Sequence, residues 1–241
     1  MTNTPLIELK NITHSYGTKS VLHDLTLEFK AKQLSCLLGS SGSGKTTILR
    51  LIAGLETPTN GQIIIENKIL TKNKQILIPP HQRNIGFIFQ DLALWPHFTI
   101  YKNIAFGLNE RKEKGVRDTV FKMLEFFDLQ EHADKYPHQL SGGQKQLVAI
   151  SRSLVLKPKI LLMDEPLANL DVKLKRKMLE HIKNLKQNFE LSIIYVTHDH
   201  KEAFAIADKI VVLNNGKIEE TGTVEQIKKS ENKFTKYFLE Y

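Results

Sequence analysis

Residues 39–46 read GSSGSGKT and fit the pattern G-x-x-x-x-G-K-[ST], which demands a particular local structure. An apolar run of strand length, residues 34–38, precedes them, and residues 47–53 are suited to a helix. Small residues let successive backbone N–H groups turn inward, and the start of a helix adds a dipole that favours an anion. We therefore predict a strand, loop and helix that bind a triphosphate, with Lys45 near the β- and γ-phosphates and the Thr46 hydroxyl on Mg²⁺.

A second apolar run, residues 160–163, ends in two adjacent acids, Asp164 and Glu165. A carboxylate at the carboxyl end of a parallel strand faces the ligand crevice of an α/β sheet. Asp164 is predicted to bind Mg²⁺ through water. Glu165 is predicted to be the general base that orients and polarises an attacking water. A plain surface turn is the alternative for these acids taken alone, and the phosphate loop makes it the weaker interpretation.

The spacing of apolar residues predicts an α/β chain with a helical insertion. Runs without polar alternation indicate strands buried on both faces, as in a parallel sheet. Apolar residues keep helical spacing between 116 and 127 and between 174 and 189, and no strand is evident between 89 and 159. We expect the insertion at about 95–155 and a helical tail after Thr223. The predicted strands span residues 6–12, 21–29, 34–38, 61–70, 85–89, 160–163, 193–196 and 210–213.

Composition indicates an ordinary globular chain of 241 residues, with 41% hydrophobic and 25% charged residues. Lys and Arg total 34 and Asp and Glu total 26, a net charge of +8 that favours anionic partners without choosing among them. The single cysteine, Cys36, lies in an apolar run and is predicted to be a buried thiol. No secretory signal or membrane-length apolar stretch is evident, so we expect a soluble or peripheral protein of the cytoplasm.

Residues 140–144 read LSGGQ and precede a run with helical character. A Ser-Gly-Gly turn that opens a helix is a second anion site. One chain has little use for two such sites on one triphosphate, unless the second serves the nucleotide of a partner. Here the sequence resembles the ATP-binding subunits of ABC transporters, whose signature is LSGGQ, over about residues 6–225.

The resemblance implies an α/β fold with a P-loop NTPase core built on a parallel sheet, an N-terminal antiparallel β subdomain and a helical insertion. The core and β subdomain are expected at about 1–94 and 156–241, and the helical subdomain at about 95–155. Residues 168–171 resemble the D-loop, with Ala168 where the family more often has Ser. Lys145 and Leu147 also differ from the residues that close relatives often carry, and neither position has a catalytic role in the family.

The family pattern also implies the cofactors ATP and Mg²⁺ and a role for each matching residue. Tyr16 matches the aromatic residue that stacks on adenine, and Gln90 matches the glutamine that contacts Mg²⁺ and the water region. The implied catalytic residues are Lys45 for charge neutralisation, Glu165 for the water, and His198 for holding the γ-phosphate and water in register. The implied Mg²⁺ ligands are Thr46, Gln90 and Asp164. The implied nucleotide-binding residues are Tyr16, Gly39, Ser40, Ser41, Gly42, Ser43, Gly44, Lys45, Thr46, Thr47, Gln90, Ser141, Gly142, Gly143, Gln144 and Asp171.

In this family two subunits pack head to tail and enclose two ATP molecules, each bound by the phosphate loop of one subunit and the LSGGQ of the other. Hydrolysis removes the bridge and loosens the dimer. The partners implied are a second copy of the chain, transmembrane permease subunits and a solute-binding protein, with no nucleic acid. The implied location is the cytoplasm, peripheral on the inner face of the cell membrane.

The segments 89–98 and 103–108 are most similar to importer subunits for sugars, polyamines, ferric iron, sulfate or thiamine. The apolar, Pro-interrupted stretch around Trp95 has two interpretations: it fills the core between subdomains, or it forms a groove for a short helix of a membrane subunit. Many such importers carry a further β-rich regulatory domain. Because the sequence ends at Tyr241, we do not expect regulation by that route.

Two other functions compete with an ATPase that powers import. A soluble ABC ATPase acting on DNA or ribosomes suits the positive charge, but such proteins usually carry a long coiled coil or tandem cassettes, and neither is evident here. An isolated P-loop kinase leaves LSGGQ and His198 unexplained. The sequence does not indicate which solute is transported.

Overall fold

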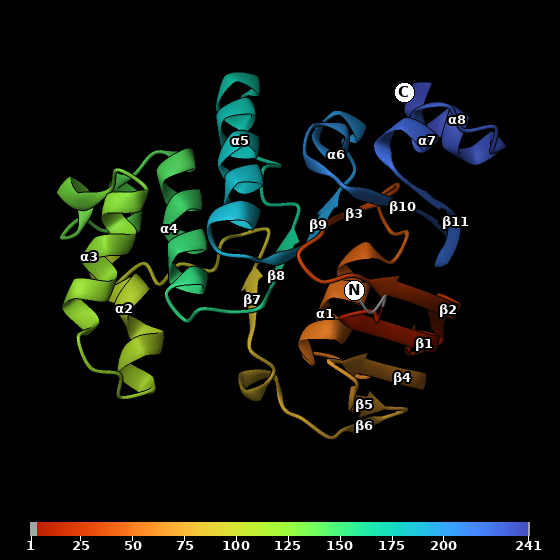
Figure 1. Cartoon of the computed structure of the whole chain (residues 1–241), viewed down its shortest axis with the longest axis horizontal. Helices are drawn as coiled ribbons and strands as arrows, with labels where there is room; N and C mark the ends of the chain where they lie inside the picture. Colours follow the sequence, from red (N-terminus) through yellow and green to blue (C-terminus); the bar gives the residue numbers. More distant parts are fainter. Residues whose placement is uncertain (1–3, 241) are drawn as a thin grey trace.

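Two β-sheets, one largely parallel and one antiparallel, organise the fold (Figure 1). The computed structural model describes residues 4–240. The larger sheet has the strand order β11-β10-β3-β9-β8-β7; neighbouring strands are parallel except β10 and β11, which form an antiparallel pair. Its strands are β3 (Leu34–Leu38), β7 (Ile85–Ile88), β8 (Ile160–Asp164), β9 (Ser192–Thr197), β10 (Lys209–Asn214) and β11 (Lys217–Gly222).

Strands β3, β8 and β9 are buried on both faces, which confirms the prediction from their uninterrupted apolar runs, whereas Ile85 and Phe87 of β7 are only partly buried. Successive side chains alternate between two cores. Leu37 and Ile194 pack toward the antiparallel sheet and α1 (Lys45–Ala53). Cys36 and Tyr195 pack toward the helices on the other face, and Cys36 is fully buried, as predicted. The sheet therefore forms the central layer of the protein.

The antiparallel sheet has the strand order β2-β1-β4-β5-β6 and covers α1. In β1, buried and partly exposed residues alternate, so one face is apolar and the other meets solvent. Ile7 and Leu9 on that apolar face pack in one cluster with Ile48 and Ile52 of α1. The strands are β1 (Ile7–Tyr16), β2 (Lys19–Phe29), β4 (Asn60–Ile65), β5 (Lys68–Lys72) and β6 (Gln75–Ile76).

The single strand predicted at residues 61–70 is wrong, because the chain reverses within it. Glu66 and Asn67 have φ angles of 50° and 61°, and Ile65 pairs directly with Lys68. Two consecutive residues with positive φ form the tight turn that suits a two-residue hairpin. Because glutamate seldom adopts a positive φ, the sequence gives little sign of a turn at Glu66. The apolar residues on both sides therefore predict one continuous strand. The structure has β4 and β5 here.

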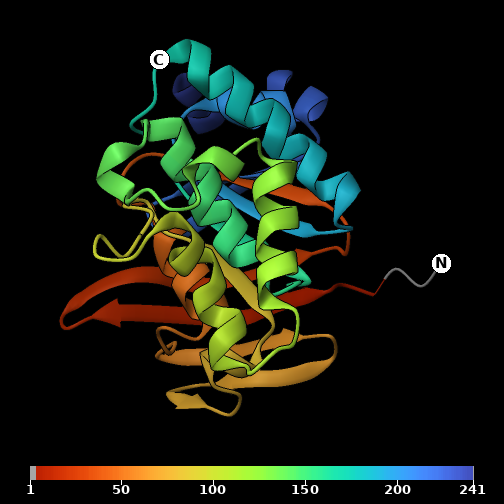
Figure 2. The ribbon, with the colours of Figure 1, turned by 90° about the vertical axis from the view of Figure 1, so that its left-hand side faces the viewer.

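The chain between β7 and β8 contains helices and no strand within the described residues. Figure 2 shows these helices in front of the two sheets. Val120 and Leu124 lie buried on one helix face, as their spacing predicts. The helices of this segment are α2 (Ile100–Glu110), α3 (Val116–Phe126) and α4 (Gly142–Leu154), with 3₁₀ turns η2 (Gln130–His132) and η3 (Pro137–Gln139).

The remaining helices follow β8 and β9 or form the tail. Met178, Ile182 and Leu185 are buried on one face of α5, which confirms the predicted helix. The predicted helical tail is present as two short helices. These elements are α5 (Val172–Asn188), α6 (His200–Ile206), α7 (Val224–Lys228) and α8 (Lys233–Glu240), and a further 3₁₀ turn, η1 (Pro80–Gln82), precedes β7. Over residues 4–240, none of the helices combines the length and the apolar character needed to cross a bilayer.

A buried arginine fastens α1 to the antiparallel sheet. The Arg83 guanidinium donates to the carbonyl oxygens of Leu51 and Ile52, at 3.3 and 2.8 Å, and to the Thr71 hydroxyl at 2.7 Å. Burial lowers the pKa of Arg83 to about 10. A cation at the carboxyl end of a helix satisfies carbonyl groups that lack partners within the helix. This contact adds to the apolar packing that holds α1, and the loop before it, against the antiparallel sheet.

Candidate functional site

Four parallel strands bring the predicted residues to one edge of the larger sheet. Since β3, β9, β8 and β7 are neighbours and run in the same direction, their carboxyl ends meet. Gly39 follows β3, Asp164 ends β8, and His198 follows β9. Gln90 lies two residues beyond the end of β7. Ligands of open α/β sheets bind outside this edge.

The loop after β3 has the backbone that a phosphate site requires. Gly42 and Gly44 have φ angles of 80° and 101°, which glycine adopts without steric cost. A Cβ atom on Gly39 would lie 2.2 Å from the Leu213 carbonyl oxygen, so only glycine fits there. No side chain caps the start of α1, and Ser40 and Ser41 are exposed. Uncapped N–H groups at the start of a helix are donors that suit an anion.

Lys45 is a buried cation at the centre of this loop, with 4% of its surface exposed. Its Nζ atom donates to the carbonyl oxygens of Gly39 and Ser40, both at 2.8 Å, and lies 3.5 Å from the Ser43 hydroxyl. Burial lowers the pKa of Lys45, and the charges of Glu165 and Asp164 oppose the shift. The Lys45 ammonium group is thus held within the loop that is predicted from the sequence to bind phosphates.

Thr46 and Asp164, two predicted Mg²⁺ ligands, are in direct contact. The Thr46 hydroxyl donates to Asp164 Oδ1 at 2.9 Å. Burial raises the pKa of Asp164, while the hydrogen bond from Thr46 lowers it. Within residues 4–240, no group of three or more His, Cys, Asp or Glu side chains is placed to hold a metal ion. Mg²⁺ takes few protein oxygens and completes its shell with water and phosphates, so this pair fits a magnesium ion bound with a nucleotide.

Glu165 and His198 meet beside this pair. His198 Nδ1 lies 3.0 Å from Glu165 Oε2. The Glu165 backbone has a φ of 41°, and its N–H donates to the Val196 carbonyl at 3.0 Å, which fixes the turn after β8. Strained backbone of this kind costs about 1–3 kcal/mol and is concentrated at functional sites. The carboxylate and the imidazole are therefore held together at the edge where the phosphate loop begins.

Tyr16 stands at the end of β1, beside the first turn of α1. Its hydroxyl donates to Glu56 Oε2 and lies 3.4 Å from the Thr47 hydroxyl, while 45% of the residue stays exposed. Burial and the hydrogen bond with Glu56 raise the pKa of Tyr16. Its ring is fixed at one edge and open to solvent, as stacking against a base requires. The sequence did not indicate a role for Glu56, because its partner Tyr16 lies on a strand far from it in the sequence.

The signature residues form the start of α4. Ser141 accepts a hydrogen bond from the Gln144 N–H at 3.3 Å, and Gln144 Oε1 accepts from the Ser141 N–H at 2.9 Å. Gln144 Nε2 therefore donates to His132 Nε2, at 2.8 Å. A Cβ atom on Gly143 would lie 2.8 Å from Leu174 Cδ1. Ser141 and Gly142 are exposed, whereas the Gln144 side chain is used within the chain.

Gln90 and Asp171 lie outside the cluster around Lys45. Gln90 lines a cavity of about 190 Å³ together with Gly142 and Lys145 of the signature helix. Asp171 caps α5, and its carboxylate accepts from the Leu174 N–H at 3.0 Å. The structure therefore joins Lys45, Thr46, Asp164, Glu165 and His198 along one edge, and places Gln90 and Asp171 beside the signature residues.

A family model described as "ABC transporter" matches residues 22–168. The chain belongs to the ABC transporter family. This match contains the phosphate loop, the signature, Asp164 at the end of β8 and Glu165 after it. Members of the ABC transporter family are therefore the proper comparison for its site.

Similar proteins include ATP-binding proteins of import systems. The Fe(3+) ions import ATP-binding protein FbpC of Vibrio cholerae is 46% identical over 93% of this chain and 63% of its own length. The spermidine/putrescine import ATP-binding protein PotA of Clostridium acetobutylicum is 45% identical over 97% of this chain and 66% of its own length. This chain thus spans slightly less than two thirds of each relative.

A solved structure of the ATP-binding cassette MJ0796 confirms the fold. It is 32% identical, has a TM-score of 0.78, and covers 90% of this chain and 98% of its own. That structure is a dimer in a post-hydrolysis state, bound to ADP and Pi. The P-loop NTPase fold predicted from the motifs is therefore correct.

Proposed function

We propose that this chain binds ATP with Mg²⁺ and hydrolyses it as the ATP-binding subunit of an ABC importer. The observation that carries the proposal is the meeting of Lys45, the Thr46–Asp164 pair and the Glu165–His198 pair at the carboxyl edge of one sheet. Phosphoryl transfer needs this combination of positioning and charge stabilisation. FbpC and PotA are named as import proteins for ferric ions and polyamines, which supports import without choosing a solute.

Each residue has a separate part in the proposed reaction. The loop N–H groups and Lys45 bind the phosphates. Thr46 and Asp164, with Gln90 reaching them from the loop after β7, would hold Mg²⁺, which would supply charge neutralisation at the phosphate oxygens. Glu165 orients the attacking water and accepts its proton. His198, fixed by Glu165, holds the γ-phosphate in register.

The signature residues serve a second copy of the chain in this proposal. Ser141 and Gly142 are exposed at the start of α4, a helix of 13 residues whose N-terminal dipole favours an anion. In this proposal the phosphate loop of one copy and the signature residues of the other complete one nucleotide site across a head-to-tail dimer. The dimeric MJ0796 structure supports this arrangement.

We propose that the permease docks in a surface groove beside β7. It has a volume of about 470 Å³ and is lined by Trp95, Phe106 and Arg152 among other residues. The rings of Trp95 and Phe106 lie 4.6 Å apart, the Arg152 guanidinium lies 5.0 Å from the Trp95 ring, and Phe106 is 36% exposed. Clustered aromatic residues with an arginine are typical anchors of protein interfaces. Of the two interpretations of this stretch, the docking groove is the better supported.

Replacement of one groove aromatic tests the docking proposal. We expect Phe106→Ser to weaken capture of a multi-span membrane protein from native membranes about tenfold, because it removes an apolar anchor. Phe121→Ser is the matched control: Phe121 is 37% exposed on α3 and does not line the groove. Equal capture by both variants, at unchanged melting temperatures, contradicts docking at this groove.

Association with the permease implies the location and the remaining partner. The chain would act in the cytoplasm, peripheral on the inner face of the cell membrane. An importer of this type also implies a solute-binding protein, which would deliver the solute to the permease.

A further inference from the structure

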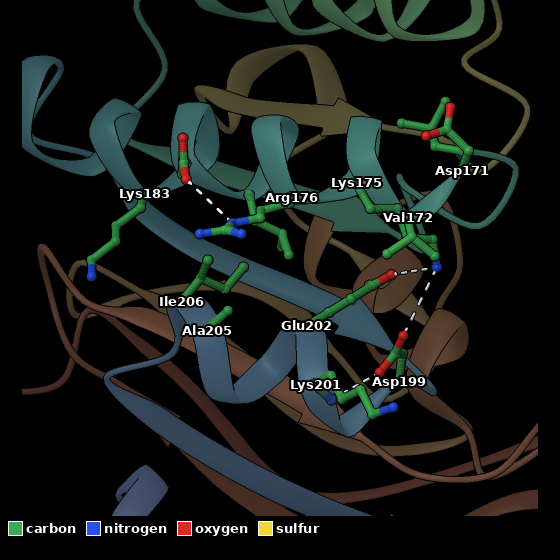
Figure 3. A pocket seen from close by; sticks show the side chains of 13 residues that line it. Asp171, Val172, Lys175, Arg176, Lys183, Asp199, Lys201, Glu202, Ala205 and Ile206 are labelled. Atoms are coloured by element: carbon green, nitrogen blue, oxygen red, sulfur yellow. Dashed lines mark hydrogen bonds and ion pairs between the residues drawn. The ribbon is translucent and has the colours of Figure 1, made fainter.

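Glu202 is a buried carboxylate outside the residues assigned so far. It lies on α6, is 4% exposed, and lines the groove between α5 and α6 (Figure 3). Its Oε2 atom accepts from the Tyr195 and Thr197 hydroxyls, both at 2.8 Å. Its Oε1 atom accepts from Lys175 Nζ at 2.8 Å. A buried charge is retained only where it is paired and hydrogen-bonded, and Glu202 meets both conditions with partners from two other elements.

The Glu202 carboxylate fixes the chain on both sides of His198. Thr197, the residue before His198, has one hydroxyl proton and donates it to Glu202. Its oxygen is then free to accept, and it accepts from the Asp199 N–H at 3.0 Å. The Thr197 side chain and the Asp199 backbone are thus hydrogen-bonded to each other, with His198 between them in the sequence. If Glu202 did not hold the Thr197 proton, the hydroxyl could rotate and this hydrogen bond would lose its fixed direction.

Lys175 links the Glu202 carboxylate to the first turn of α5, which also contacts the signature helix. Lys175 Nζ also lies 3.9 Å from Asp199 Oδ2, and Asp199 Oδ1 accepts from the Lys201 N–H at 2.8 Å (Figure 3). Lys175 follows Leu174, the residue that packs against Gly143 of the signature helix. The first turn of α5 therefore contacts the signature on one side and the segment after His198 on the other.

We propose that Glu202 is a positioning residue for His198, which it holds in register with Glu165 through Thr197, and that Lys175 ties this register to the first turn of α5. The inference rests on the proposed function for its effect on hydrolysis. Its geometric part, the fixing of residues 197–199 by Glu202, stands independently of ATP.

The kinetic test is Glu202→Gln, which keeps the size of the side chain and removes its charge. The amide has one acceptor oxygen, so in either orientation its NH₂ group faces a donor, either the Lys175 ammonium or the Tyr195 and Thr197 hydroxyls, and the side chain is displaced. We therefore expect kcat to fall about 10- to 100-fold while KM for ATP stays within about twofold, because misplacement of a reacting group by about 1 Å costs this much. Glu180→Gln is the matched control, since Glu180 lines the same groove, is exposed, and forms a long ion pair with Arg176, at 3.9 Å. Its kcat is expected to remain that of the wild type.

A double substitution separates positioning from general stability. If Glu202 acts through His198, Glu202→Gln has no further effect on the residual rate of His198→Ala. A structural role adds its own loss in that background. Thr197→Val, which removes only the linking hydroxyl, is expected to reproduce the kcat loss and provides a second variant should Glu202→Gln fail to fold.

The test independent of activity is the exchange rate of the Asp199 amide hydrogen, measured by NMR on the nucleotide-free chain. We expect exchange at least about tenfold faster in Glu202→Gln and Thr197→Val than in the wild type and Glu180→Gln, because the Thr197 acceptor is lost or unfixed. Unchanged exchange, or a wild-type kcat in Glu202→Gln, overturns the proposal. A wild-type chain without ATPase activity would instead contradict the proposed function, and the exchange rates would still decide the role of Glu202.

Discussion

Glu165→Gln is expected to reduce ATP hydrolysis about 10²- to 10⁴-fold and to leave ATP affinity within about twofold of the wild type. The amide keeps the shape of the side chain and its contact distance to His198, but it cannot accept a proton from water. The residue lies at the sheet edge beside Asp164 and 3.0 Å from His198 Nδ1, so it faces the place where the γ-phosphate is expected. Asp164, the neighbouring carboxylate, accepts from Thr46 and is assigned to Mg²⁺, so Glu165 is the carboxylate assigned to the water.

The measurement for Glu165→Gln is single-turnover hydrolysis at saturating Mg²⁺ and ATP, together with binding of a fluorescent ATP analogue. Glu110→Gln is the control for the chemical change, since Glu110 is exposed at the end of α2. Hydrolysis at the wild-type rate in Glu165→Gln would refute the assignment of the general base.

Lys45→Met is expected to act one step earlier, on nucleotide binding itself. The ammonium group is buried in the phosphate loop, and removing one partner of a buried charge pair costs about 2–5 kcal/mol. ATP affinity should therefore fall about 30-fold or more, and hydrolysis should become undetectable. The variant also loses the donors to the Gly39 and Ser40 carbonyls, so its melting temperature must be measured alongside the affinity.

Lys209→Met is the matched control for Lys45→Met. Lys209 is a partly buried lysine whose pKa, like that of Lys45, is lowered by burial, and its Nζ donates to the Glu28 carbonyl at 2.9 Å. It begins β10 and pairs with Ser35 near the start of β3, so it lies at the amino edge of the parallel sheet, away from the site. Equal losses of ATP affinity in the two variants would show that the effect comes from the loss of any buried lysine.

Local patterns were sufficient to predict the elements that carry the site. The strands around Cys36, Leu162 and Ile194 are short, uninterrupted and buried on both faces, and this burial is visible directly as composition. The loop at residues 39–46 requires glycine wherever the backbone is left-handed or closely packed, so the positions of its glycines predict its conformation. Parallel strands then bring these residues to one edge without further information.

Turns caused the errors in the predicted strands. β11 was not predicted, although Asn215 and Gly216, with φ angles of 45° and 74°, form an Asn-Gly turn that is a strong hairpin signal. The turn at Glu66 gave no comparable signal, because its conformation is imposed by the pairing of β4 with β5 and β1. Register across a sheet is a tertiary property, so local propensity did not reveal it.

Partners that come from distant segments could not be predicted from motifs. The contact of Gln144 with His132, and of Glu202 with Lys175, joins side chains on different elements. Neither His132 nor Lys175 stands at a spacing that marks it in the sequence. Sequence reasoning therefore named the residues expected to touch the nucleotide and missed the residues that hold them.

In the proposed mechanism two copies of the chain enclose ATP, and one copy alone is incomplete. The most direct measurement is the ATPase rate per chain across a wide range of protein concentrations, at saturating Mg²⁺ and ATP, with the mass of the particles followed by light scattering. We predict that the rate per chain rises with concentration and that dimers accumulate with ATP in Glu165→Gln. A full rate per chain that stays constant on dilution, in samples that contain only monomers, would contradict the account.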